Sequence, residues 1–167
     1  MDANFSVASR LQHLSGEKYQ AQIDSSWQQG RSVFGGIVLA LVVRAAQAAC
    51  PKFRLRTLSM EFIAPVRVGT LEISVQAERS GMLVRRQSHR LTQNGDLVGL
   101  ATVSLARDRS RTGDFHSAMM PEVAKPDQVP AIQLEPGMPA FTRHLEYRPC
   151  LGAPPATAAN TSRSGGW

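Results

Sequence analysis

The run VFGGIVLALVVRAAQAACP, at residues 33–51, limits the fold more than any other stretch of the chain. Within residues 37–49 only Arg44 and Gln47 are polar, and Pro51 follows as a stop signal. A helix over these residues would be about 20 Å long and apolar on every side, which is typical of a buried helix. Its leucines and alanines favour a helix, while its β-branched residues leave a buried strand as the competing interpretation.

Four segments with alternating polar and apolar residues follow this run: LRTLSMEFIAP, TLEISVQAE, MLVRRQSHRLTQ and LVGLATVSLAR. Alternation places side chains on the two faces of a strand in turn. The last two segments are joined by QNGD at residues 93–96, and an Asn-Gly pair is a strong hairpin signal. Residues 18–24 predict a weaker strand. We therefore predict an α+β fold in which an antiparallel sheet wraps around one long buried helix and covers most of its surface.

The composition is that of an ordinary soluble domain. The chain has 167 residues, enough for one hydrophobic core, and its two cysteines, Cys50 and Cys150, stand far apart and outside any metal-binding spacing. Free thiols of this kind favour a reducing compartment. The polar N-terminus has no apolar signal core, and the longest apolar run is much shorter than the ~20 residues of a membrane helix. We expect a soluble cytoplasmic protein without a membrane span.

The formal net charge of +6 is carried by residues 1–107, which hold 13 Lys and Arg against 7 Asp and Glu. A basic surface can attract nucleic acid or a phosphorylated small molecule, or it can have no ligand at all. The arginines are scattered through the predicted strands and form no recognition motif. We therefore predict no nucleic-acid partner.

A different kind of sequence begins at residue 108, rich in proline and without periodicity, which is typical of a linker. FTRHLEYRP, starting at residue 141, alternates again and predicts a strand, and CLGAPPATAANTSRSGG after it predicts a loop. We therefore divide the chain into an N-terminal domain at 1–107, a proline-rich linker at 108–140 and a further segment at 141–167.

The order of VFGG, an apolar helix, FIAP and a QNG hairpin resembles the acyl-CoA thioesterase II family and its thioesterase-like relatives. The resemblance implies a double hotdog fold, in which each half wraps an antiparallel sheet around a long helix. It covers residues 18–107 as the first hotdog, and residues 141–167 look like the start of a second hotdog that is incomplete here. In the family the catalytic Asp, hydroxyl residue and Gln lie mainly in the second hotdog, and the Asp and Gln positions would fall beyond Trp167.

Two glycines, Gly35 and Gly36, are suited to the chemistry that this resemblance implies. Hydrolysis of a thioester requires stabilisation of a developing oxyanion, and a helix N-terminus offers free backbone N–H groups and a positive dipole end. Glycine would let the thioester approach that backbone closely. We therefore predict Gly36 as a catalytic residue and Phe34, Gly35 and Gly36 as substrate-binding residues. The alternative is that the glycines only pack a tight loop against the sheet.

A carboxylate that positions water is harder to find, because the predicted helix contains no Asp or Glu. Glu61 is our second candidate catalytic residue, although a solvated strand face would explain it too, and Asp24 is the next acid to consider. Arg85 and Arg86 are predicted to bind the phosphates of coenzyme A. No metal is predicted, because the histidines lie far apart in the sequence (His13, His89, His116 and His144).

Two classes of function remain open on the sequence. The first is an acyl-CoA thioesterase, or a truncated remnant of one, that hydrolyses an acyl-CoA thioester to free acid and coenzyme A. The second is a non-catalytic hotdog half that binds an acyl thioester or serves only in assembly. Neither requires a cofactor, since coenzyme A enters as part of the substrate. A single hotdog leaves sheet edges unpaired, so we expect a homo-oligomer that forms through these edges.

Overall fold

The computed structural model describes residues 4–109, 113, 119, 121–153, 160 and 164–167. The chain divides into two compact units, the first formed by Met1–Ser110 with Pro139–Phe141 and the second by Arg111–Met138 with Thr142–Trp167. The domain boundaries expected from the sequence stay a prediction. Part of the expected linker (110–112, 114–118 and 120), His116 within it, and part of the expected loop after residue 150 (154–159 and 161–163) lie outside the described residues.

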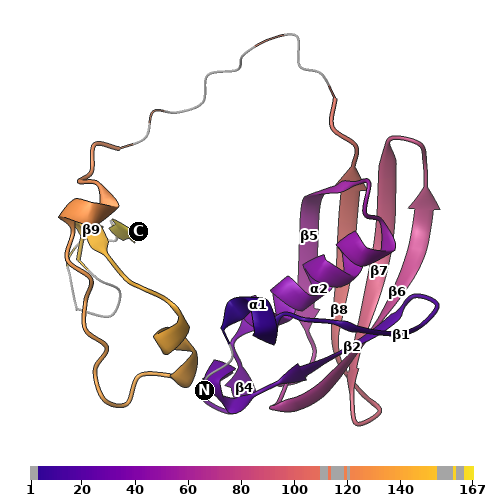
Figure 1. Cartoon of the computed structure of the whole chain (residues 1–167), viewed down its shortest axis with the longest axis horizontal. Helices are drawn as coiled ribbons and strands as arrows, with labels where there is room; N and C mark the ends of the chain where they lie inside the picture. The colour runs from indigo at the N-terminus through magenta and orange to yellow at the C-terminus, as the bar shows by residue number, and fades with distance from the viewer. Residues whose placement is uncertain (1–3, 110–112, 114–118, 120, 154–159, 161–163) are drawn as a thin grey trace. The chain divides into compact units, whose positions relative to one another are not determined.

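The apolar run forms helix α2, Gly35–Ala49, as predicted from its composition (Figure 1). The helix begins two residues earlier than expected, so both glycines lie in its first turn rather than in the preceding loop. Its buried side chains all belong to one face (Ile37, Val38, Leu41, Val42, Ala45 and Ala46). Leu39, Ala40 and Val43 are half-buried, and only Arg44, Gln47 and Ala48 are exposed, so the helix is covered except along one stripe.

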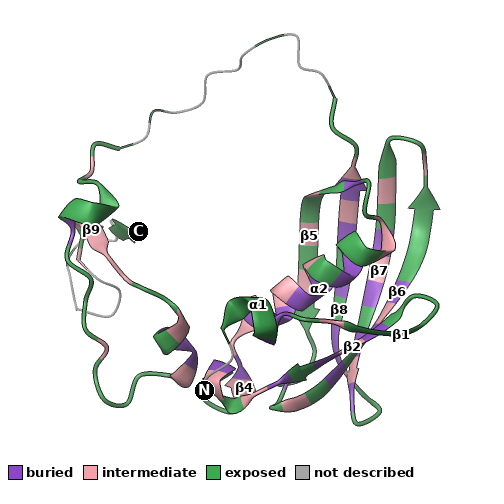
Figure 2. Cartoon of the chain, viewed as in Figure 1, coloured by how far each residue is buried: buried purple, intermediate pink, exposed green. Residues whose placement is uncertain are grey.

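A six-stranded sheet packs against this helix, in the order β1-β2-β6-β7-β8-β5, and every neighbouring pair in it is antiparallel. Its strands are β1 Gln12–Ser15, β2 Lys18–Ile23, β5 Arg54–Phe62, β6 Gly69–Ser80, β7 Val84–Gln93 and β8 Asp96–Ala106. Buried residues gather on α2 and on the strands that face it (Figure 2). The predicted α+β hotdog architecture is therefore confirmed for the first unit.

The register of the sheet follows the alternation of the sequence. On β6, Leu71, Ile73 and Val75 are buried while Glu72 and Gln76 are exposed. The predicted hairpin joins β7 to β8, with Asn94 at φ 54° and Gly95 at φ 89°. Two consecutive residues with positive φ are what a tight hairpin turn requires, and Asn followed by Gly adopts them at low cost.

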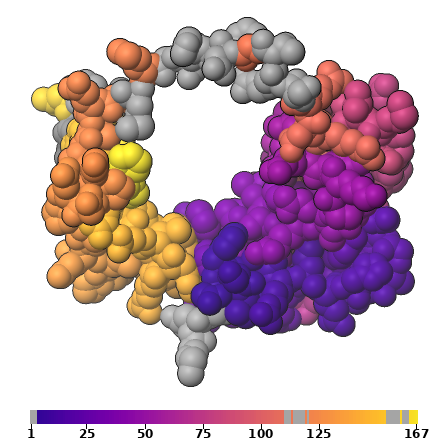
Figure 3. Space-filling model, turned by 45° about the horizontal axis from the view of Figure 1, so that its top comes forward, coloured from indigo at the N-terminus to yellow at the C-terminus, as the bar shows by residue number. Residues whose placement is uncertain are grey.

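The residues between β2 and α2 form short ordered elements. They form a short 3-10 helix, η1 Ser25–Trp27, and a two-stranded ribbon of β3 Gln28–Gln29 and β4 Ser32–Val33. The N-terminal helix α1, Phe5–Ala8, lies nearby, with the ring of Phe5 6.2 Å from that of Trp27 and 6.0 Å from the guanidinium carbon of Arg44 on α2. In the space-filling view the indigo N-terminal segment lies directly against the violet segment that carries α2 (Figure 3).

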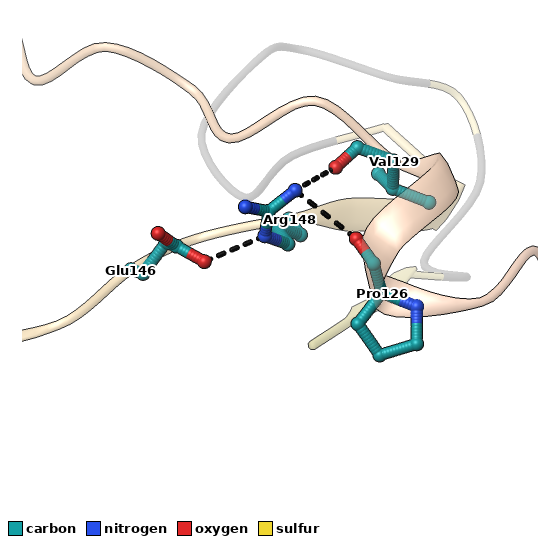
Figure 4. Close-up of polar contacts among 4 residues, drawn as sticks. All are labelled: Pro126, Val129, Glu146 and Arg148. Atoms are coloured by element: carbon teal, nitrogen blue, oxygen red, sulfur yellow. Dashed lines mark hydrogen bonds and ion pairs between the residues drawn. The ribbon is translucent and has the colours of Figure 1, made fainter.

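The second unit contains little regular structure among its described residues. It has a 3-10 turn, η2 Pro126–Gln128, and a short ribbon of β9 Pro149–Gly152 and β10 Ser164–Gly166. Arg148 holds it together: Nη1 donates to the carbonyl oxygens of Pro126, at 3.0 Å, and Val129, and Nε pairs with Glu146 at 2.6 Å (Figure 4).

The prediction of a strand from residue 141 onward is wrong. Ala140–His144 instead form a 3-10 helix, η3, and strand β9 starts only at Pro149, the last residue of the expected strand, and continues into the expected loop. The alternation that we used was short, and Phe141 is buried in the core of the first unit rather than on a strand. A few alternating residues cannot separate a strand from a turn that inserts a single aromatic side chain.

Candidate functional site

The backbone just before α2 is held by hydrogen bonds to two other segments of the chain. The N–H of Val33 donates to the carbonyl oxygen of Val66 at 2.8 Å, and the N–H of Phe34 donates to that of Trp27 at 2.7 Å. Phe34 is the N-cap residue, and its side chain makes no capping hydrogen bond. The N–H of Ile37 donates to the carbonyl oxygen of Phe34 at 3.1 Å, so within the first turn it is the N–H groups of Gly35 and Gly36 that lack the side-chain acceptor that commonly satisfies them.

Aromatic rings cover both glycines of this turn. A Cβ atom built on Gly36 would lie 2.7 Å from Cζ of Phe34 and closer still to Cε1, and one built on Gly35 would lie 3.2 Å from Cζ of Phe62. Distances under 3.0 Å are essentially never seen for real Cβ atoms. The space that we expected a substrate to use at Gly36 is therefore filled by the protein's own Phe34.

A third ring fixes the position of Phe34. Phe141 stacks on it with ring centroids 4.1 Å apart and an interplanar angle of 2°. Phe141 is 9% exposed, whereas Phe62 is 51% exposed and presents an open apolar face. We call Phe34, Phe62 and Phe141 the aromatic cluster. Sequence reasoning found Phe34 but missed the other two, because nothing local in the sequence says that residue 141 returns to the helix start.

Glu61 does not join this site. Side chains alternate along β5, and Phe62 reaches Gly35 on the helix side of the sheet, so Glu61 points to the outer face. It is exposed and lies opposite Leu100 of β8, which is also exposed. The catalytic role of Glu61 stays a prediction, and the position of its side chain does not support it. Asp24 has a structural task, since its carboxylate accepts a hydrogen bond from the N–H of Ser26 at 2.7 Å and caps η1.

Arg85 and Arg86 lie at the opposite end of α2 from the glycines. They line a cavity of about 220 Å³ together with Cys50, the residue that follows the helix. A helix of 15 residues is about 22 Å long, so the two parts of the predicted substrate site are separated by roughly that length. The structure brings Phe34, Gly35 and Gly36 together but not with the two arginines.

A chain of buried polar side chains runs along β7 beneath the helix, and the sequence analysis missed it. His89 is 1% exposed, and one of its ring nitrogens, Nε2, lies 3.2 Å from Oε1 of Gln87. The amide of Gln87 in turn donates to the sulfur of Cys50 at 3.3 Å. Nδ1 of His89 is buried without a hydrogen-bond partner, and burial lowers the pKa of His89 to about 4. The signal was available in the register, because β7 pairs His89 with the inward-facing Val75 of β6.

The described part of the chain has neither a membrane-spanning helix nor a metal-binding cluster. No helix there is long and apolar enough to cross a membrane. No group of three or more His, Cys, Asp or Glu side chains in those residues could hold a metal ion.

A family model described as the acyl-CoA thioesterase N-terminal domain matches residues 23–106. That range contains α2, β5, β6, β7 and β8, and with them Gly35, Gly36 and both arginines. No curated protein sequence matches the chain.

Solved structures share the architecture at low sequence identity. A protein of unknown function with a hot dog fold from Alicyclobacillus acidocaldarius is 23% identical, with a TM-score of 0.78 over 89% of this chain and 55% of that one. The acyl-CoA thioesterase II TesB2 from Mycobacterium marinum is 17% identical, with a TM-score of 0.67 over 93% of this chain and 56% of that one. The PaaI protein from the phenylacetic acid degradation operon of E. coli is 17% identical, with a TM-score of 0.53 over 60% and 79%. The chain thus spans little more than half the length of the first two structures.

Proposed function

This chain belongs to the family of acyl-CoA thioesterase N-terminal domains, and we propose that its first unit binds an acyl-CoA thioester at the start of α2. In this proposal the uncapped N–H groups of the first helical turn hold the thioester carbonyl, and the aromatic cluster contacts the acyl group. Hydrolysis of the thioester to free acid and coenzyme A is the reaction that the family resemblance supports.

The observation that carries the proposal is the pairing of uncapped N–H groups with an exposed aromatic ring. A carbonyl oxygen that develops negative charge is stabilised by preorganised N–H donors and by the positive end of the helix dipole. Phe62, beside Gly35 and half exposed, offers apolar surface within reach of a group held there. An acyl thioester combines these two requirements, because its carbonyl is polar and its chain is apolar.

We infer further that this chain hydrolyses its ligand poorly. Helix α2 contains no Asp or Glu, and Glu61 lies on the outer face of the sheet. These observations favour the second candidate function, in which the first unit is a non-catalytic hotdog that binds an acyl thioester.

The test is a binding titration of the chain with a medium-chain acyl-CoA, run beside an assay of thiol release. We expect saturable binding with little release of coenzyme A. Phe62→Ala should weaken binding about 5- to 20-fold, because it removes an aromatic contact worth roughly 1–2 kcal/mol. Phe5→Ala is the matched control, since Phe5 is 50% exposed but lies on α1.

Absence of saturable binding would sink the proposal, as would equal losses in the two phenylalanine variants. Rapid turnover by the 167-residue chain would instead show that the first unit carries its own catalytic group, and Glu61 and Asp24 would be the first residues to replace.

The free edge of the sheet supports our prediction of self-association. Within the described residues β5 pairs only with β8, so its other edge is unpaired over nine residues. Phe62 and Ile63, 51% and 49% exposed, extend an apolar surface at its end. Long unpaired edges with apolar neighbours favour pairing with another strand. We propose that a second copy of this chain pairs along β5.

Sedimentation velocity over rising concentration measures this association. We expect a dimer at about 100 µM that is weakened by Ile63→Lys, because a charge would be buried in the new interface. Leu14→Lys is the control at the opposite edge, on the four-residue strand β1, where Leu14 is 44% exposed. A clean monomer at that concentration would refute the proposal, and a monomer produced by Leu14→Lys would move the interface to β1.

A further inference from the structure

Three arginines meet at one small cavity where α2 ends. Arg79 of β6 and Arg85 and Arg86 of β7 line this cavity, whose volume is about 220 Å³, together with the hydroxyl-bearing Ser80 and the amide-bearing Gln87. We call it the basic cavity. All of these residues belong to the first unit.

The lining of the basic cavity carries three arginines and one acid, Glu17. Arg79 and Arg86 are directly opposite each other on neighbouring antiparallel strands, a placement that is destabilising for like charges. Within the described residues none of the three arginines forms an ion pair. Glu17 is the one acidic side chain in the lining, and it already accepts a hydrogen bond from the hydroxyl of Tyr19 at 3.3 Å.

Arg85 is held in place but lacks an acceptor. Its guanidinium carbon lies 5.2 Å from the ring centroid of Phe53, and that of Arg107 lies at the same distance from the same ring. Nε of Arg85 is buried and has no hydrogen-bond partner among the described residues. A buried charged donor without an acceptor is costly, and an anion beside this guanidinium would offset part of that cost electrostatically.

We propose that the basic cavity is a binding site for a phosphate group. Arginine forks match the oxygens of phosphate in pairs, and three of them can neutralise a dianion. The size of the cavity favours a small group, because 220 Å³ is below the usual volume of a pocket for a whole drug-sized ligand. The ligand is therefore a single phosphate, either free or at the end of a longer molecule.

The phosphate could come from two sources, the nucleotide end of acyl-CoA or a free phosphate ion, and the position of the cavity bears on both. It lies about 22 Å from Gly35, at the other end of a helix of 15 residues. The phosphate belongs either to the nucleotide end of the acyl-CoA that we propose above or to an independent phosphate ion. Only the first source depends on the proposed thioester site, and binding of inorganic phosphate tests the basic cavity without it.

The experiment titrates the full chain with inorganic phosphate and, separately, with adenosine 3′,5′-bisphosphate at low ionic strength by calorimetry. We expect saturable binding that Arg79→Gln and Arg86→Gln each weaken at least fivefold. Arg85→Lys keeps the charge but loses the fork, and should weaken it as well. Arg90→Gln is the control, because Arg90 is an exposed arginine on the same strand outside the cavity.

Competition identifies the source. If acyl-CoA displaces phosphate, the cavity receives the substrate's phosphate; if both bind together, it receives an independent phosphate, and either result supports the site. Absence of saturable phosphate binding overturns the proposal. An equal loss of phosphate affinity in Arg90→Gln also overturns it, because binding would then depend only on the net charge of the chain. Circular dichroism of each variant excludes loss of the fold as the cause.

Discussion

Gly36→Val is expected to destabilise the first unit by about 2–4 kcal/mol. The new side chain would overlap the ring of Phe34, which cannot turn aside without leaving its stack on Phe141. Forcing extra carbons into a packed site costs about 1–3 kcal/mol, and loss of the aromatic pair adds about 0.5–1.5 kcal/mol. The free energy of unfolding, measured by urea denaturation with circular dichroism, reports the loss.

A double-mutant cycle isolates the ring as the cause. Gly36→Ala should destabilise the wild-type chain, because its Cβ meets the same ring. In a Phe34→Ala background the same substitution should instead stabilise by up to about 1 kcal/mol, since alanine is the better helix former. Gly35→Ala is the matched control: its Cβ would lie 3.2 Å from the half-exposed Phe62, which can move, so we expect little change.

The same sign in both backgrounds would contradict this account of Gly36. Destabilisation in both backgrounds would show that the fold needs the glycine for a reason other than the ring of Phe34. The alternative named at the sequence level, that the glycines serve close packing, gains support from the geometry. Gly36 packs against the ring of Phe34, and Gly35 packs against the ring of Phe62 on strand β5 of the sheet.

Helix α2 and the strands of the main sheet could be predicted because local pattern and burial agree there. Long apolar or alternating runs leave only one arrangement in which the apolar faces are covered, and Asn94–Gly95 sets the hairpin register directly. The prediction for residues 141–149 failed because their alternation is short. Their structure depends on the contact of Phe141 with Phe34, which is far away in the sequence.

The site was harder to predict than the fold. Phe34, Gly35 and Gly36 are consecutive, so local reasoning could group them, whereas Phe62 and Phe141 join them only through tertiary structure. Glu61 was chosen as an acid without knowledge of which face of β5 would meet the helix. Gln87 and His89 alternate along β7 and are buried, although both are polar, because they pair in register with Ala77 and Val75 of β6. Placing strands in register before assigning their faces would have found them.

His89 is expected to make the stability of the first unit fall as the pH drops below neutral. Burial lowers the pKa of His89 to about 4, while an unfolded histidine has a value near 6.5. Between these values the unfolded chain binds a proton that the folded chain does not. Stability is therefore constant above about pH 6.5 and lost progressively toward pH 4, by on the order of 2–4 kcal/mol.

The variant that tests this assignment is His89→Gln, which retains a hydrogen-bonding side chain beside Gln87 but cannot titrate. It should lower the stability at pH 7.5 and flatten the dependence between pH 6.5 and 5, a range above that in which most carboxylates are protonated. His13→Gln, at an exposed histidine of β1, leaves His89 in place and should keep the wild-type slope. If His89→Gln kept that slope too, the loss of stability would have to come from another group. The buried ring would then be protonated inside the fold, where Nε2 faces Oε1 of Gln87 but Nδ1 has no partner among the described residues.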